Sequence, residues 1–244
     1  MHFNSANSCK IDLKQLDRKL LTYPDDVDSL VTKGDEAKYK EYSFSKPSTS
    51  VVSMTVDIRN QSLYYLDVDT RTIYRNENFS VTMEKSEVTG ERIQVGVSRA
   101  LCRIAFDWIS HNIYWTDRYH NWIAVRPVFS NDTLMYKVIL QDQIVVPIGL
   151  AVDPVSGYLF WSDTMPSGRI ERSNLLGEDR TVLISDSVGF PTAIAIDRVE
   201  RRIYWTDFTR FTIERVSYDG QNRKVLHRKN GQPFADIFIY KTGN

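Results

Sequence analysis

Cysteine is scarce in this chain, positive and negative charges balance, and no long apolar run is present. Two cysteines and four scattered histidines among 244 residues predict no metal site. Lysine plus arginine equals aspartate plus glutamate at 31 each, which excludes a general nucleic-acid or anionic-membrane binder. No run could span a bilayer and no hydrophobic signal region follows Met1. Contact with a membrane is therefore expected only through a segment absent from this chain.

Motifs that carry catalysis are missing as well. The sequence has no Ser/His/Asp grouping, Gly-Xaa-Ser-Xaa-Gly elbow, phosphate loop or His-Glu-Xaa-Xaa-His. We therefore predict neither an enzyme nor a bound cofactor. Carboxylates gather at Asp25-Asp26-Val27-Asp28 and at Asp67-Val68-Asp69. Calcium binding is the alternative at these two segments, while solvated turns are the simpler interpretation.

One five-residue motif recurs four times along the chain. Its closing aspartates are separated by 50, 46 and 44 residues, a period typical of a propeller or an array. A second aspartate ends an apolar run ten residues before each motif aspartate. Two apolar strands joined by a tight turn are thus predicted in each repeat. The motifs are Leu63-Tyr64-Tyr65-Leu66-Asp67, Ile113-Tyr114-Trp115-Thr116-Asp117, Leu159-Phe160-Trp161-Ser162-Asp163 and Ile203-Tyr204-Trp205-Thr206-Asp207, and the earlier aspartates are Asp57, Asp107, Asp153 and Asp197.

The remainder of each repeat predicts two more strands. Ile170-Glu171-Arg172 leads through Gly177 to Val182-Leu183 with the same spacing that joins Ile213-Glu214-Arg215 through Gly220 to Val225-Leu226. Four short strands in roughly 45 residues are typical of a propeller blade, and no segment shows a sustained helical period.

These motifs resemble the low-density lipoprotein receptor class B repeat, the Tyr-Trp-Thr-Asp module found in the lipoprotein receptor and its relatives, the epidermal growth factor precursor, nidogen and the Wnt co-receptors. The resemblance covers roughly residues 50 to 240. It implies an all-β fold, a six-bladed propeller in which the motif aspartate and aromatics tie each blade to its neighbour.

We interpret the eight repeated aspartates as structural, since repeat architectures place the same residue wherever the same junction recurs. A metal-dependent propeller hydrolase would need polar side chains aimed inward from several blades. The predicted inner strands, such as Ile194-Ala195-Ile196, are instead almost wholly apolar before each aspartate.

The two ends of the chain predict an incomplete ring. Residues 10–21 align with 215–226, so residues 1–46 are expected to hold partial blade strands and then a long irregular connection from 24 to 46. A helix through Leu13, Leu16 and Leu20 is the alternative. Residues 47–244 are expected to form four whole blades and, at 232–239, the first strand of another. We expect a fragment of a larger receptor, an idea that a monodisperse, cooperatively melting monomer of residues 1–244 would contradict.

Three sequons favour a secreted, glycosylated protein: Asn60-Gln61-Ser62, Asn78-Phe79-Ser80 and Asn131-Asp132-Thr133. Asn60 is expected between strands one and two of its blade, and Asn131 between strands three and four. Cys9 and Cys102 could pair in an oxidising compartment, while a buried thiol is the alternative for Cys102.

Loops that follow each motif emerge on one face of the predicted disc and differ where the strands repeat. Variation on a repeated scaffold is where binding specificity usually resides, and aromatic and arginine side chains are enriched at interface hot spots. The alternative is that these aromatics turn inward and pack the blade tops. The candidates for partner binding are Tyr119, His120, Trp122, Met165, Phe190, Phe208, Arg210 and Phe211.

In the lipoprotein receptor relatives, propeller histidines help to release ligand at endosomal pH, and His120 could titrate in that range. If His120→Ala left the partner affinity unchanged from that of the parent protein at both about pH 5.5 and about pH 7.4, that role would be contradicted.

The resemblance implies an extracellular or cell-surface module that binds a protein ligand of the lipoprotein, Wnt or matrix type without catalysis. A basement-membrane structural propeller is the first alternative, and a propeller hydrolase is the second.

Overall fold

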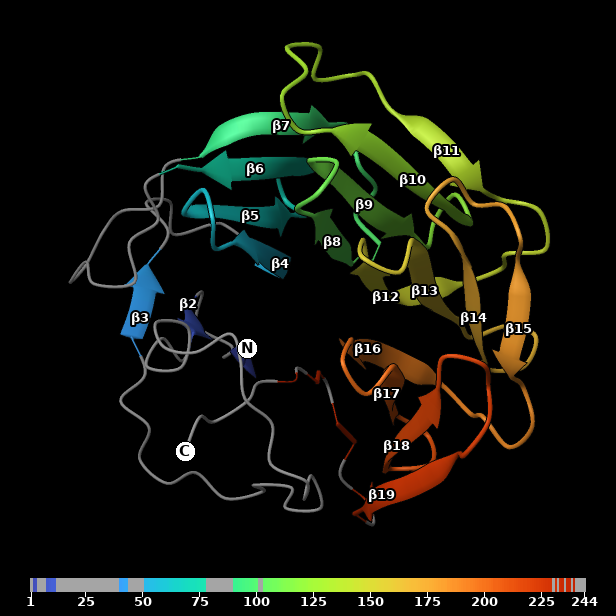
Figure 1. The fold of residues 1–244 in the computed structure, drawn as a ribbon. Coiled ribbons are helices and arrows are strands. Elements are labelled where there is room, and N and C mark those ends of the chain that lie inside the picture. The colour runs from blue at the N-terminus through green and yellow to red at the C-terminus, as the bar shows by residue number, and fades with distance from the viewer. Residues whose placement is uncertain are drawn as a thin grey trace.

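The computed structural model describes residues 51–77, 90–100, 103–229, 231, 233, 234, 236, 237 and 239, and the backbone of three short strands before residue 44. The described residues form strands, turns and bends (Figure 1). In this part of the chain no helix is long and apolar enough to cross a membrane. The predicted all-β fold is confirmed.

Four antiparallel sheets of four strands form four blades, each in the order of the sequence. Blade 1 contains β4 (Val51–Asp57), β5 (Ser62–Asp67), β6 (Thr72–Asn76) and β7 (Glu91–Val95). Blade 2 contains β8 (Ile104–Asp107), β9 (Asn112–Asp117), β10 (Trp122–Pro127) and β11 (Lys137–Leu140). Blade 3 contains β12 (Pro147–Asp153), β13 (Tyr158–Asp163), β14 (Arg169–Asn174) and β15 (Thr181–Ile184). Blade 4 contains β16 (Pro191–Asp197), β17 (Arg202–Asp207), β18 (Thr212–Ser217) and β19 (Lys224–Arg228).

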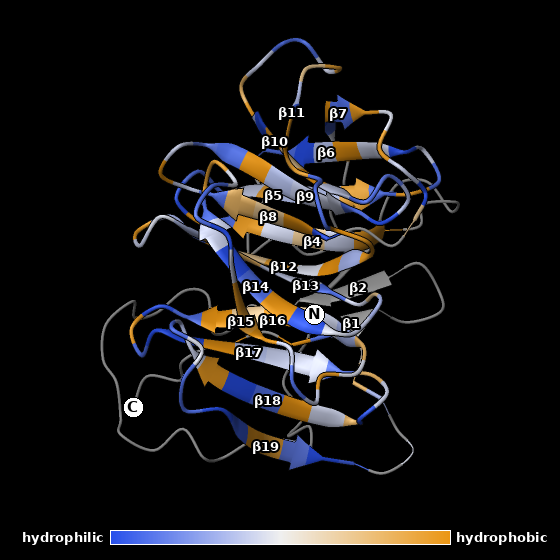
Figure 2. Cartoon of the chain, turned by 90° about the vertical axis from the view of Figure 1, so that its right-hand side faces the viewer, coloured by the Kyte–Doolittle hydropathy of each residue, from blue (hydrophilic) through white to orange (hydrophobic). Residues whose placement is uncertain are grey.

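The blades are arranged around a common centre, as in a propeller (Figure 1). The first strands β4, β8, β12 and β16 lie next to one another at this centre, and the fourth strands lie at the rim. Seen from the side, apolar and hydrophilic residues alternate along many strands, as expected where each strand face meets a different environment (Figure 2). The predicted four whole blades are thus confirmed.

Tight turns explain the constant ten-residue spacing between the two aspartates of a blade. Asp57 pairs with Ser62 at the hairpin end, and Val51 pairs with Asp67 at the other. Each hairpin turn ends with a left-handed residue four positions after its aspartate, at a φ of 49° to 71°. Glycine adopts this conformation without strain, yet three of the four blades use another residue. These residues are Gln61, His111, Gly157 and Arg201.

The core lies between the blades, and the two aromatics of one motif face different neighbours. Trp115 belongs to the cluster shared with blade 1, which includes Tyr64 and Ile93. Tyr114, one residue earlier, belongs to the cluster shared with blade 3, which includes Trp161. The same division recurs one blade further, where Phe160 packs with Trp205 of blade 4. Successive side chains of a strand point to opposite faces, so each motif is buried on both sides.

A small sheet precedes blade 1 and corrects one prediction. Strand β2 (Ser8–Ile11) pairs with β1 (His2–Phe3) and with β3 (Lys40–Ser43). The expectation that residues 24–46 are irregular was therefore wrong for Lys40–Ser43, because pairing with β2 gives this segment a ladder of backbone hydrogen bonds. The possible helix through Leu13, Leu16 and Leu20 lies outside the described residues.

The predicted strand at 232–239 stays a prediction, because residues 232, 235 and 238 lie outside the described residues. Its described residues, Pro233, Phe234, Asp236, Ile237 and Ile239, carry no strand. Asp236 pairs with Arg103, just before β8, at 3.1 Å.

Candidate functional site

The turns that follow the motif strands, together with the connections that lead into the next blade, form one face of the propeller, here called the motif face. The turns are 68–71, 118–121, 164–168 and 208–211, and the connections into blades 3 and 4 are 141–146 and 185–190. The turns at 58–61, 108–111, 154–157 and 198–201 form the opposite face, since adjacent strands are antiparallel.

On the opposite face, each blade's first aspartate accepts two backbone hydrogen bonds. The Oδ1 atom of Asp107 accepts from the amides of Ile109 at 2.8 Å and Ser110 at 3.0 Å. Asp57, Asp153 and Asp197 accept in the same way from the residues two and three positions later. The repeated carboxylate therefore fixes the turn locally.

On the motif face, two motif aspartates also hold the connection from the preceding blade. Asp163 accepts from the amides of Val145 at 2.9 Å and Val146 at 2.8 Å. Asp207 accepts from Gly189 at 2.6 Å and Phe190 at 3.0 Å. Both carboxylates are fully buried, a position that is tolerable because several donors compensate the lost hydration.

The other two motif aspartates hold their own turns. Asp67 accepts from the amide and the hydroxyl of Thr70, and Asp117 accepts from the amides of Tyr119 and His120, each at 3.0 Å. The Nδ1 atom of His120 also lies 2.8 Å from Asp117 Oδ2. The structure thus positions His120 through its neighbouring carboxylate, while its role in pH-dependent release stays a prediction.

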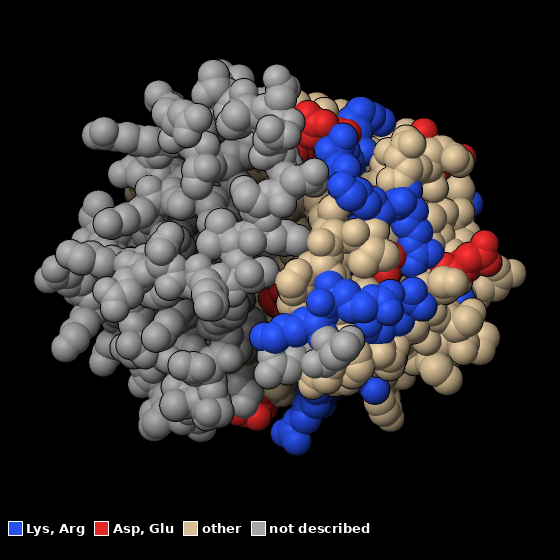
Figure 3. Space-filling model, turned by 90° about the horizontal axis from the view of Figure 1, so that it is seen from below, with Lys and Arg blue, Asp and Glu red and all other residues tan. Residues whose placement is uncertain are grey.

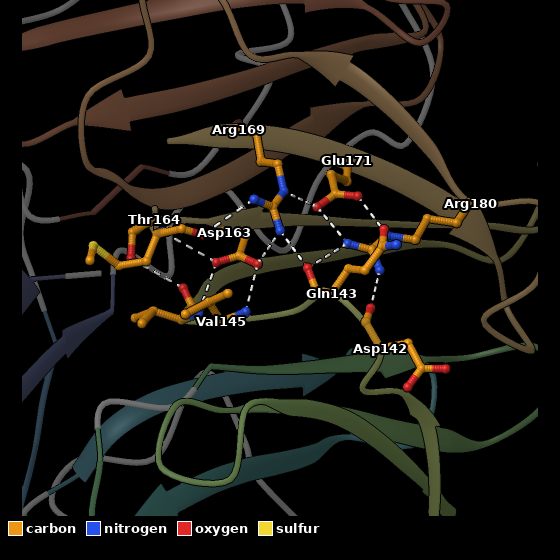
Figure 4. A network of polar contacts seen from close by, with 10 residues as sticks. Asp142, Gln143, Val145, Asp163, Thr164, Arg169, Glu171 and Arg180 are labelled. Carbon is orange, nitrogen blue, oxygen red and sulfur yellow. Dashed lines mark hydrogen bonds and ion pairs between the residues drawn. The ribbon is translucent and has the colours of Figure 1, made fainter. Parts of the chain in front are cut away.

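Blade 3 carries a buried network of charges under the motif face (Figure 4). Glu171 is fully buried and accepts from Arg169 Nε at 2.6 Å and from Arg180 Nε at 2.7 Å. Arg169 also donates to Asp163 at 2.7 Å, and both arginines donate to the carbonyl of Gln143. The charges are therefore paired, and they fasten blade 3 to the connection from blade 2.

Blade 4 repeats this pairing. Glu214 is fully buried, and Arg223 Nε donates to it at 2.8 Å. Arg223 also donates to the carbonyls of Asp186 and Ser187 in the incoming connection. In both blades the guanidinium lies over the motif tryptophan, 5.6 Å from the ring centroid of Trp161 for Arg180 and 5.4 Å from that of Trp205 for Arg223.

Blade 2 departs from this arrangement. Ala124 pairs with the motif residue Trp115, as Glu171 pairs with Trp161 in blade 3. Tyr136 then packs edge-on against Trp115 at 5.5 Å, where blades 3 and 4 place an arginine. An apolar residue and an aromatic ring thus replace the buried ion pair.

This substitution produces an aromatic cluster on blade 2, formed by Tyr119, His120, Trp122 and Tyr136. His120 stacks on Trp122 at 4.6 Å and meets Tyr119 edge-on at 4.9 Å, and Trp122 lies 5.9 Å from Tyr136. Tyr119 is 75% exposed and Tyr136 is also exposed. Three cluster members were predicted from the sequence. Tyr136 was missed, although its place two residues before the Val138 strand position, where blades 3 and 4 carry Arg180 and Arg223, was a usable signal.

Asn121, in the motif-face turn of blade 2, links this cluster to the connection into blade 3. With its amide oriented to donate, Asn121 contacts the carbonyl of Val145 and lies 3.0 Å from that of Arg118. Val145 and Met165 are exposed on the same face. Val145 was also missed, because the sequence alone shows it only as part of an apolar pair before a strand.

The remaining predicted residues lie on blade 4. Phe190 meets Phe208 edge-on at 6.3 Å, and Phe208 is exposed. Arg210 lies 3.6 Å from Glu214, and Phe211 occupies the left-handed turn position at a φ of 55°. The structure therefore brings the candidates together in two groups, one on blade 2 and one on blade 4, with blade 3 between them.

Charge is unevenly distributed although the whole chain is neutral. Residues 185–231 contain nine lysines and arginines and six carboxylates, of which Asp197, Asp207 and Glu214 are buried. Lys224, Arg228 and Lys229 are exposed on and just after β19. Lysine and arginine side chains form a broad band on the side of the molecule seen in Figure 3. Blade 4 is thus basic, whereas the blade 2 cluster is aromatic.

The structure describes some of the predicted modification and metal sites, and others lie outside the described residues. Asn60 and Asn131 lie in exposed turns between the expected strands, whereas Asn78, Cys102 and the Cys9 side chain lie outside the described residues. Among the described residues no three His, Cys, Asp or Glu side chains gather as metal ligands would. At Asp67-Val68-Asp69 the amide of Asp69 donates to Asp67 at 2.9 Å, which forms a turn.

The fold and the motif face define a protein class, a β-propeller with repeated blades and variable loops. No family model matches the chain. Over 200 residues it is 27% identical to a vitellogenin receptor of Solenopsis invicta, a match that covers 80% of this chain and 11% of the receptor.

Two solved structures share the fold. A chain of a crystal structure of a nidogen/laminin complex has a TM-score of 0.66 and 25% identity, covering 80% of this chain and 70% of that one. Virginiamycin B lyase from Staphylococcus aureus has a TM-score of 0.60 at 12% identity, covering 85% and 66%, which shows the fold alone. Together with the motifs, these likenesses support a propeller of low-density lipoprotein receptor class B repeats.

Proposed function

We propose that this propeller is the protein-binding module of an extracellular or cell-surface receptor related to the lipoprotein receptors, and that it performs no catalysis. The observation that carries the proposal is the aromatic cluster of blade 2. It stands on loops that differ between blades, at a place where blades 3 and 4 bury an ion pair instead. Exposed aromatic rings on a rigid scaffold bind with little loss of conformational entropy.

The ligand class is inferred from the relatives. The similar receptor is named for vitellogenin, so a lipoprotein-type protein is the first choice. Wnt or matrix proteins, suggested by the class B repeats and by the nidogen/laminin complex, are the others. The chain spans 11% of the receptor's length, and binding is therefore proposed for this module alone.

Binding can be measured by surface plasmon resonance with the full chain, using vitellogenin, a purified lipoprotein and laminin as probes. Tyr119→Ala removes an exposed ring that belongs to no core between the blades. We expect about tenfold weaker binding of the recognised probe, the loss typical of an interface hot spot.

Val199→Ala is the matched control, because Val199 is 61% exposed but lies on the opposite face. Its affinity should equal that of the parent protein. Equal losses for both variants, or binding of none of the three probes, would contradict the proposal. Repeating the measurement at high salt separates the aromatic cluster from the basic surface of blade 4, since only the latter contact is screened.

A structural matrix propeller is the alternative, supported by the nidogen/laminin likeness. Selective binding of laminin in the same experiment would favour it. We also propose that the eight repeated aspartates serve the architecture, because they accept hydrogen bonds from turns, from incoming connections and from side chains of the scaffold such as Arg169 and Tyr218.

A further inference from the structure

The loop between β10 and β11 exposes an unusual number of apolar side chains. Phe129 is 60% exposed, and Leu134, Met135 and Tyr136 are exposed later in the same loop. The same loop contains Asn131, which is exposed and begins an Asn-Asp-Thr triplet.

The backbone on both sides of Asn131 is held in place. Arg126 donates to the carbonyl of Ser130 at 2.9 Å, and the amide of Val95 in blade 1 donates to the carbonyl of Thr133 at 3.1 Å. Asp132 accepts from the amide of Leu134 at 2.9 Å. Asn131 therefore projects from a fixed loop.

Phe129, two residues before Asn131, is positioned as a platform. The guanidinium of Arg75 lies 5.3 Å from the centroid of its ring, and the ring of His111 lies at 5.2 Å. These contacts support part of the ring while the rest stays open to solvent. The apolar C–H face of a sugar packs well on an aromatic ring, and Phe-Ser-Asn-Asp-Thr places such a ring beside an acceptor asparagine.

We propose that Asn131 carries an N-linked glycan whose first sugar packs on Phe129. The proposal rests on the extracellular location proposed above. A lipid-linked oligosaccharide pyrophosphate is the donor. Asn131 Nδ2 loses one proton and forms a bond to the sugar C1, while the C1–O bond breaks and the lipid pyrophosphate leaves.

Asn60 offers an internal comparison. Its Nδ2 donates to Asp57 Oδ2 at 2.7 Å, and the residue two positions before it is Ile58, which has no ring. A glycan at Asn60 would lack an aromatic platform.

The test is secretion of the full chain from cells behind a heterologous signal peptide, which makes the outcome independent of where the natural protein resides. Peptide mass spectrometry after enzymatic deglycosylation in heavy-oxygen water gives the occupancy of each asparagine. We expect high occupancy at Asn131. We also expect a melting temperature about 2 °C or more above that of Asn131→Gln.

Phe129→Leu keeps an apolar side chain and removes the ring, so it should lower occupancy at Asn131 severalfold and abolish the glycan's effect on melting. Ile58→Ala is the matched control and should change neither value. An unoccupied Asn131, or a Phe129→Leu protein with unchanged occupancy and unchanged glycan stabilisation, would overturn the proposal. Failure of the ligand-binding experiment would leave this result unaffected.

Discussion

Asp163 illustrates how much one buried carboxylate does at the level of the residue. Its two oxygens accept from the amides of Val145 and Val146 and from the guanidinium of Arg169. The amides belong to the connection from blade 2, and the guanidinium belongs to the next strand. One side chain thus joins a turn, a connection and a buried ion-pair network.

Replacing Asp163 with asparagine should destabilise the protein by about 3 kcal/mol. An amide group would turn a donor toward other donors and remove one of the two charged partners of Arg169. Urea denaturation followed by tryptophan fluorescence measures the change. Asp69→Asn is the control, because Asp69 is exposed in a turn, and its free energy of unfolding should stay within about 0.5 kcal/mol of the parent. A similar small effect for Asp163→Asn would contradict the structural role.

At the level of the element, blades 2, 3 and 4 share a plan but fill one position in two ways. Blades 3 and 4 place a glutamate opposite the motif tryptophan and an arginine over its ring, whereas blade 2 uses Ala124 and Tyr136. The ion pair and the aromatic pair therefore fill equivalent space beside the same tryptophan.

This equivalence can be tested on blade 4. Arg223→Tyr alone leaves the buried Glu214 without its main partner and should cost about 3 kcal/mol. The double variant Arg223→Tyr with Glu214→Ala reproduces the residue types of blade 2, and most of that loss should be recovered. Chemical denaturation of the parent, both single variants and the double variant gives the coupling free energy. Strictly additive losses would show that the two arrangements are not interchangeable.

The strands and hairpins were predictable because the same residue pattern recurs in each repeat of the sequence. The motif aspartates set the register of the hairpins, and the spacing from Ile170 to Leu183 located the outer strands β14 and β15. The alignment of Tyr136 with Arg180 and Arg223 was a signal for its place in the blade, but its packing on Trp115 also depends on how the long loop after Pro127 returns to the sheet. Strand β3 was not predicted for a similar reason, because its partner β2 is remote in sequence.

The sequence predicted several residues of the candidate site but not how they are arranged in space. Sequence reasoning found Tyr119, His120 and Trp122 on one loop, and the structure adds their mutual stacking. Whether Phe190 and Phe208 join them was beyond the sequence, since blade 3 separates the two groups.

At the level of the whole molecule, the cores between blades bury the phenols of several tyrosines. Burial raises the pKa of Tyr64, Tyr65 and Tyr114 to about 12, and for Tyr114 the nearby Asp107 adds to the effect. In the unfolded chain tyrosine ionises near pH 10. The stabilisation from keeping these phenols neutral is therefore complete below about pH 10 and is lost as the pH rises toward 12.

We expect the free energy of unfolding to fall steeply between about pH 10 and pH 12, with each buried tyrosine contributing about 1 kcal/mol by pH 11. Urea denaturation at pH 7, 9 and 11 measures the fall. In Tyr114→Phe the fall between pH 9 and pH 11 should be smaller by about that amount, although the variant also loses the hydrogen bond to the carbonyl of Leu175. An unchanged difference between pH 9 and pH 11 would contradict this account.

The opposite orientations of the two motif aromatics have a further consequence for how such a chain can change. Trp115 faces backward to blade 1, and Tyr114 faces forward to blade 3, so every unit offers one kind of surface behind and the complementary kind ahead. A duplicated unit inserted anywhere would find a fitting neighbour on each flank. Growth by gene duplication therefore needs no new interface, and diversity can accumulate in the loops alone.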